Sequence, residues 1–162
     1  MAVPTSLIPV TPISLSTSAV LGASAPVTST VTLTTPTSAA IITGLNTPVA
    51  ITVPALGSYI RVKAYLPSVT QSAAAATTIC LYSGATAGAL TTLVQSVNYT
   101  TATGGTSIGG VFEFLVPVTA AGTTFPQAGS SIFLSIAATD STGNFVVNGA
   151  AATPASMIVE VL

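Results

Sequence analysis

Few side chains in this sequence could do acid–base or metal chemistry. Five are charged, 3% of the 162 residues: Arg61, Lys63, Glu113, Asp140 and Glu160. Soluble globular domains usually carry about 25% charged residues. Histidine is absent, and Cys80 is the single cysteine. A zinc or iron–sulfur site needs about four Cys or His ligands and is therefore excluded, as is general acid–base catalysis by histidine.

The three acidic residues support little other chemistry. Glu113 and Glu160 are the two candidates for hydrolysis by paired carboxylates, which requires two carboxyl groups roughly 5–10 Å apart and a raised pKa on one of them. Asp140 begins the segment Asp-Ser-Thr-Gly-Asn, which superficially resembles a calcium loop but has one carboxylate where calcium binds several. We interpret it as a turn in which Asp140 accepts hydrogen bonds from its own backbone. We expect no catalytic residue, no metal and no cofactor, and hence no enzyme.

The positions of the charged residues on the predicted strands indicate which strands are neighbours. In the run 58–66 side chains alternate between two faces, and one face carries Tyr59, Arg61, Lys63 and Tyr65. Glu113 and Glu160 fall on the polar faces of two other runs, 111–116 and 156–162. Opposite charges directly across a strand pair gain about 0.2–1 kcal/mol.

We predict that the strand with both cations lies beside the strand of Glu113 or of Glu160. The functional alternative is a ligand-facing cluster, such as a glycan site with the two tyrosines as stacking platforms. Cys80 lies in an apolar run, and we expect it to be a small buried side chain.

Alternation with period two and an abundance of Val, Ile and Thr predict strands from residue 28 onward. The clearest run is 58–66, which ends before Pro67. Others include 30–35, 39–43, 77–82, 90–99, 110–116 and 131–137. Turn signals separate them, among them Gly44-Leu45-Asn46-Thr47-Pro48. We predict an all-β protein, an antiparallel, jelly-roll-like β-sandwich of about eight or nine strands over residues 28–162.

Residues 1–27 differ from the rest. They contain four prolines and no charge, which predicts an extended arm. Seven apolar side chains would remain in water unless something covers them: Leu7, Ile8, Val10, Ile13, Leu15, Val20 and Leu21. Either the arm packs on its own domain as an edge strand, or it reaches a neighbouring subunit or lattice.

The composition excludes some partners and argues against targeting segments. Two cations cannot form the basic stripe that nucleic-acid binding requires. No apolar run reaches 18 residues, so we expect no membrane-spanning helix. The small residues at 22–25 look like a signal-peptidase site, but no Lys or Arg precedes them and prolines interrupt the segment. We therefore expect no cleaved signal peptide.

Three segments carry a resemblance: Tyr-Ile-Arg-Val-Lys-Ala-Tyr-Leu-Pro-Ser at 59–68, Cys-Leu-Tyr-Ser-Gly at 80–84, and the ending Pro-Ala-Ser-Met-Ile-Val-Glu-Val at 154–161. In style, residues 45–162 resemble the small β-sandwich virion proteins of tailed bacteriophages, in particular capsid decoration (cement) proteins and fibre head domains. The resemblance implies a jelly-roll-like homotrimer on the capsid surface, made in the host cytoplasm. It also implies an N-terminal arm that clasps the major capsid protein or other virion subunits.

The leading hypothesis is a capsid decoration protein whose apolar arm and sandwich base bind and stabilise the head shell. One alternative is a tail-fibre or spike head domain that binds a host receptor. Another is an extracellular filament subunit in which residues 1–27 donate a strand to the next subunit.

Overall fold

Eleven β-strands and no helix make up the part of the chain that the structure describes. The structure is a computed structural model, and the described residues are 18–71, 76–100, 105–118, 120 and 127–162. The strands are β1 (Ala19–Ala23), β2 (Thr30–Leu33), β3 (Ala40–Asn46), β4 (Ile51–Thr52), β5 (Tyr59–Gln71), β6 (Ala76–Gly84), β7 (Thr92–Thr100), β8 (Gly105–Pro117), β9 (Ser131–Asp140), β10 (Phe145–Asn148) and β11 (Ser156–Val161).

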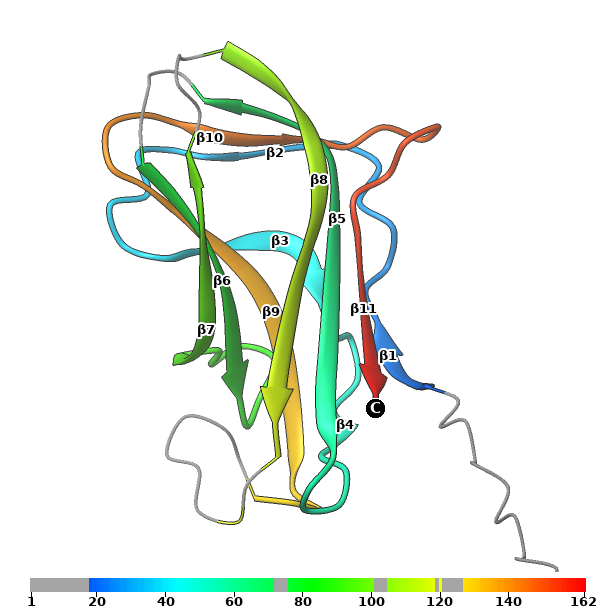
Figure 1. The fold of residues 1–162 in the computed structure, drawn as a ribbon. Coiled ribbons are helices and arrows are strands. Elements are labelled where there is room, and N and C mark those ends of the chain that lie inside the picture. The colour runs from blue at the N-terminus through cyan, green and yellow to red at the C-terminus, as the bar shows by residue number, and fades with distance from the viewer. Residues whose placement is uncertain (1–17, 72–75, 101–104, 119, 121–126) are drawn as a thin grey trace, which may run out of the picture.

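The strands form two antiparallel sheets that face each other (Figure 1). The first has the order β1-β11-β5-β10-β2, with β8 on the other edge of β5. The second has the order β3-β9-β6-β7, with β4 beside β9. The predicted all-β sandwich is confirmed. β5 pairs along one edge with two strands in turn, β11 at Ile60–Tyr65 and β10 at Val69–Gln71.

Eight of the strands follow the connectivity of a jelly roll. These eight strands are β2, β3 and β5–β10. β2 pairs with β10, β3 with β9, β5 with β8 and β6 with β7, so the first pairs with the last and each later strand with the next one inward. This is the pairing of one long hairpin rolled up on itself, and the contacts of β10 with β5 and of β9 with β6 complete the two sheets. β1, β4 and β11 are additions to the roll.

The core fills the space between the sheets. On β5 the inward side chains Ile60, Val62, Ala64 and Leu66 are fully buried, as the alternation predicts. Phe114 of the neighbouring β8 is buried among them. Burying a side chain of this size stabilises the fold by about 1.5–3 kcal/mol.

Pro67 does not end its strand, so the predicted end at Leu66 is wrong. β5 continues to Gln71. Pro67 lies where β5 changes partner, because the pairing with β11 ends at Tyr65 and the pairing with β10 begins at Val69. On the β8 side the register also skips Pro67. A proline, which has no N–H to donate, is tolerated at such a gap in the ladder.

The predicted turn at 44–48 is also wrong in its first half, because β3 runs through to Asn46. Gly44 has φ 88°, a conformation that glycine adopts without steric cost. The register with β9 shifts between Ile41 and Asn46. The glycine therefore marks a β-bulge within the strand rather than the end of the strand.

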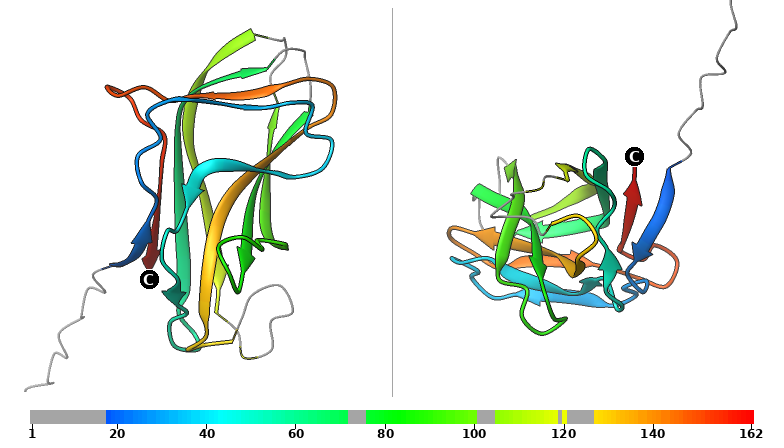
Figure 2. Two further views of the ribbon diagram at one scale, coloured as in Figure 1. Left: turned by 180° about the vertical axis from the view of Figure 1, so that it is seen from behind. Right: turned by 90° about the horizontal axis from the view of Figure 1, so that it is seen from below.

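The described part of the predicted N-terminal arm lies along the domain. β1 pairs with β11, and the two lie side by side at one edge of the molecule (Figure 2). Val27 is buried and exchanges two backbone hydrogen bonds with Ala155. Leu21 packs against the core. The other predicted arm residues Leu7, Ile8, Val10, Ile13 and Leu15 lie outside the described residues. Below, "the arm" means residues 1–17.

Candidate interaction face

Four strands of the first sheet present one continuous surface to solvent, which we call the outer face. It consists of the outward side chains of β8, β5, β11 and β1. The register aligns them in four rows across the strands, which are Pro117–Tyr59–Leu162, Leu115–Arg61–Glu160–Val20, Glu113–Lys63–Ile158–Ala23 and Val111–Tyr65–Ser156. The alternation that buries Ile60 and Val62 turns these side chains outward.

An ion pair occupies the middle of the outer face. Arg61 donates from Nε and Nη2 to Glu160 Oε2, each at 2.8 Å. Lys63 Nζ lies 3.3 Å from the same oxygen. The strand with both cations thus lies between the strands of Glu113 and Glu160, and the predicted cross-strand pairing is confirmed. Glu113 is directly opposite Lys63 but makes no ion pair with it in the described part of the chain.

The ion pair changes the titration of Glu160. Burial raises the pKa of this carboxyl, but hydrogen bonds and positive charge from Arg61 and Lys63 outweigh that effect and lower it below its ordinary value. A carboxylate whose pKa is lower in the folded state stabilises the fold above its unfolded pKa. It loses that contribution as the pH falls through its folded pKa.

We therefore expect Glu160→Gln to lower the thermal unfolding midpoint at neutral pH. The gap to the wild type should narrow as the pH falls below the ordinary Glu pKa of about 4.3. Thermal melts followed by circular dichroism across this range measure the effect. Tyr65→Phe on the same strand serves as a control that keeps the carboxylate, and its melts should run parallel to the wild type. A gap for Glu160→Gln that stays constant into acid would contradict the assignment.

Around the ion pair the outer face is apolar. The described residues include nine large apolar or aromatic side chains that are exposed, and six of them lie here. These six are Val20, Tyr59, Tyr65, Val111, Leu115 and Leu162. The other three, Val49, Leu56 and Leu93, lie elsewhere on the domain. Exposed apolar side chains gathered on one surface usually mark an interaction site.

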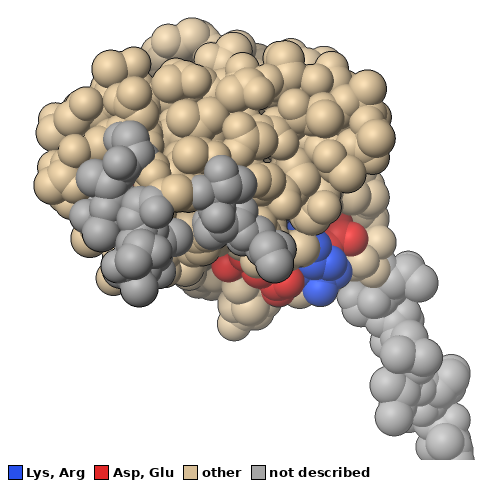
Figure 3. All heavy atoms as spheres, turned by 90° about the horizontal axis from the view of Figure 1, so that it is seen from above, with Lys and Arg blue, Asp and Glu red and all other residues tan. Residues whose placement is uncertain are grey.

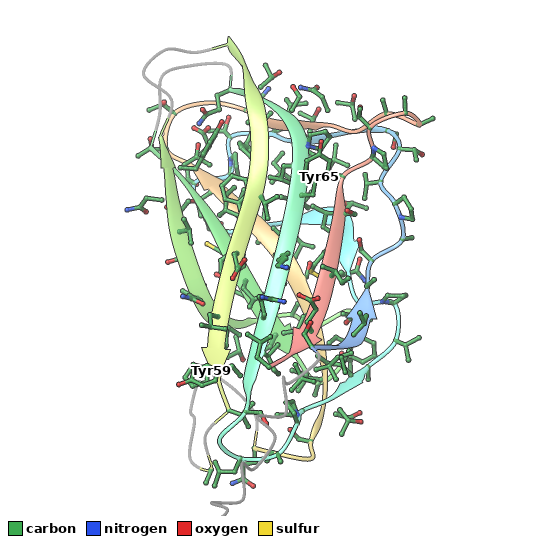
Figure 4. The ribbon with its side chains drawn as sticks, turned by 45° about the vertical axis from the view of Figure 1, so that its right-hand side comes forward. Tyr59 and Tyr65 are labelled. Carbon is green, nitrogen blue, oxygen red and sulfur yellow. The ribbon has the colours of Figure 1, made fainter. Side chains whose placement is uncertain are left out.

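The two tyrosines do not form one stacking platform. Tyr59 and Tyr65 lie at opposite ends of the segment of β5 that contributes to the outer face (Figure 4). Six residues of an extended strand span about 20 Å, which is longer than a single sugar ring. The geometry therefore favours a broad contact surface over a compact glycan site on the outer face.

Asp140 is the charged residue that lies away from the outer face, and it is fully buried. Its Oδ1 accepts hydrogen bonds from the backbone N–H groups of Thr142 and Gly143, both at 3.1 Å, which confirms the predicted turn. Its Oδ2 accepts from Gln71 at 3.3 Å and Thr77 at 3.2 Å. Gln71 also donates to Thr77. The sequence did not predict this buried cluster, because Asp140 is 69 residues from Gln71 and 63 from Thr77, and Gln71 belongs to the other sheet.

Two further features of the described residues are Cys80 and a hollow on the surface. Cys80 is buried and forms no disulfide, and burial raises the pKa of its thiol. The expected role as a small buried side chain is confirmed. A hollow of about 400 Å³ lies between β3 and the loop that joins β6 to β7. It is lined by Ile41, Thr43, Gly44, Asn46, Ala87, Gly88, Leu90 and Thr91, none of which is charged.

Within the described ranges, no group of three or more Cys, Asp or Glu residues is placed to hold a metal ion. No helix in that part of the chain has the length and apolar character to cross a membrane.

Comparison with known proteins identifies no family. No protein-family model matches the sequence, and no curated protein matches it either. Among solved structures, it is similar to a chain of infectious bursal disease virus, Gx strain, with 15% identity and a TM-score of 0.38 over 90% of this chain. It is also similar to a chain of the empty virus-like particle of cowpea mosaic virus, with 13% identity and a TM-score of 0.28 over 95% of this chain. The chain covers 36% of the first of these and 83% of the second.

Proposed function

We propose that this chain is a non-enzymatic structural protein of a virion, specifically a capsid decoration protein that attaches to the shell through its arm. The jelly roll occurs in viral capsid proteins, lectins and cupins, so the fold alone does not decide among their functions. The proposal is supported by the position of the first described residues, to which the arm is joined. β1 is the outermost strand of its sheet, and Ser18 just before it donates a hydrogen bond to Glu160 at 3.4 Å.

The arm is not needed to complete the roll. All eight strands of the jelly roll, as well as β1 and β11, find their partners among residues 19–161. The arm has no charged residue and carries Leu7, Ile8, Val10, Ile13 and Leu15. An apolar segment that begins at the edge of a finished domain suits attachment to another protein. Such attachment stabilises the shell by mass action, because the bound protein favours the assembled state.

Deletion of residues 1–17 should abolish attachment and leave the domain folded. β1 is retained in the shortened chain, so the thermal unfolding midpoint should change little. The measurement is co-sedimentation with capsid shells of the virus that encodes the protein, assembled without it. A second variant of full length, with the five apolar arm residues replaced by serine, should also lose binding, since the contacts are apolar. Unchanged co-sedimentation of both variants would refute the arm as the attachment segment.

Two other functions predict different outcomes in the same preparations. In a filament subunit assembled by strand donation, deletion of the arm would abolish polymers visible by negative-stain microscopy. Residues 19–23 already pair with β11 of their own chain, so the donated strand would have to come from the arm. In a fibre head domain, binding to host cells would persist without the arm.

A further inference from the structure

We propose that the outer face is the surface through which copies of this chain associate, so that its occupant is a second copy. The contact is separate from the proposed attachment of the arm to a shell, and each can be tested without the other. The outer face combines exposed apolar side chains, balanced charges and sufficient size for such a contact.

Apolar side chains provide the driving force. Val111 and Leu115 of β8 are 61% and 45% exposed, and Val20 of β1 is 60% exposed. Tyr59 and Tyr65 add aromatic area between them. Aromatic residues are enriched at protein interfaces because they bury much area and still offer a hydroxyl group. In water these side chains remain exposed, and a flat partner surface would cover them.

The charges on the outer face sum to zero. Arg61 and Lys63 are balanced by Glu113 and Glu160, and these are four of the five charged residues of the chain. Seen from above, the Lys and Arg atoms lie together with acidic atoms on one side of the molecule (Figure 3). Glu160 is already paired with both cations, so its burial leaves no uncompensated charge, which is the costly case.

The pattern of charge suits an identical surface. The cations lie on the central strand β5, Glu113 lies on one side of them and Glu160 on the other. Glu113 is exposed and makes no ion pair among the described residues. When two outer faces meet in opposite orientation, Lys63 of one copy can approach Glu113 of the other. A uniformly charged face would repel its own copy, whereas this one does not.

The face is large enough for a specific contact. Residues 59–65 span about 20 Å along the strand, and four strands about 4.8 Å apart give a width of nearly 20 Å. This is roughly 400 Å² of flat area per copy. Side chains that stand out from the sheet add to it, so two copies together reach about 1,000 Å², the lower limit for a specific interface.

The test is the mass of the purified protein in solution, measured by light scattering and sedimentation. We expect the wild type to associate at concentrations up to about 100 µM. The double variant Val111→Glu, Leu115→Glu should raise the dissociation constant of self-association at least about tenfold. The matched control is Val49→Glu with Leu93→Glu, which adds the same charges at side chains of similar exposure, 72% and 43%, elsewhere on the domain. The control should associate like the wild type.

Two further variants test the roles of charge and of the arm in this association. Glu113→Lys is a surface change that takes each face from zero to a charge of +2, so association should weaken at low salt and recover at high salt. Wild-type association, which depends mainly on apolar burial, should change little with salt. Deletion of residues 1–17 should leave association intact. A monomeric wild type, equal association of the face variant and its control, or loss of association on deletion of the arm would each overturn the proposal.

Discussion

Gly109→Ala should lower the free energy of unfolding by about 3 kcal/mol. Gly109 lies on β8 opposite the skipped position of Pro67. A Cβ atom there would lie 1.5 Å from the carbonyl oxygen of Leu66 and 2.6 Å from the carbonyl carbon of Pro67. These are main-chain atoms, so no side-chain rotation relieves the overlap. β5 and β8 would have to separate in the middle of their ladder.

The adjacent glycine provides a matched control. A Cβ atom at Gly110 would meet nothing within 4 Å. Gly110→Ala should leave stability unchanged or raise it by about 0.5 kcal/mol, because alanine loses less backbone entropy than glycine in a strand. Urea denaturation followed by circular dichroism compares the two variants. Equal stabilities for Gly109→Ala and Gly110→Ala would show that β5 and β8 do not approach each other as closely as described.

Asp140→Ala should lower the free energy of unfolding by a similar amount, about 3 kcal/mol, and the midpoint of thermal unfolding by about 10 °C. The carboxylate accepts four hydrogen bonds, from the N–H groups of Thr142 and Gly143 and from Gln71 and Thr77. Gln71, Thr77 and Gly143 are buried, so water cannot easily replace the lost acceptor. Leaving a buried donor without its acceptor costs about 1–3 kcal/mol.

The control is Ser141→Ala at the exposed neighbouring position, which should change the midpoint by no more than a degree or two, since surface substitutions usually cost under about 0.5 kcal/mol. Asp140→Asn should fall between the two, because the amide keeps one acceptor oxygen. If Asp140→Ala melted like Ser141→Ala, the buried cluster would have no role in holding β5, β6 and β9 together.

Local alternation of side chains was enough to predict the sandwich and the side of β5 that carries Tyr59, Arg61, Lys63 and Tyr65. The period of two placed Arg61 and Lys63 on one side of their strand, and the scarcity of other charges made Glu113 and Glu160 the available partners. In most sequences many charged residues compete for such pairs, and the same inference would fail. Here the 3% charge made the strand order around β5 partly predictable.

The features that sequence patterns missed depend on partners distant in the chain. Pro67 signals a strand end, but the gap between β11 and β10 accommodates it. Gly44 signals a turn, but a bulge against β9 uses its conformation. Residues 19–23 were placed in the arm, for which an edge strand on the same domain was one of two alternatives. That alternative holds for them, but their partner β11 lies some 140 residues later in the chain. None of these partners is visible in a local window.

The rolled hairpin also determines when this chain can fold. Thr30 pairs with Asn148 and Ala19 with Val161. β1 and β2, at the two ends of the first sheet, therefore cannot pair until β11 and β10 have been synthesised. Proteins dominated by such distant pairings fold slowly, on a scale of milliseconds to seconds. Until β10 and β11 leave the ribosome, one whole edge of β5 stays unpaired and open to other strands. The low charge that suits a neutral interface gives the nascent chain little electrostatic protection during that interval.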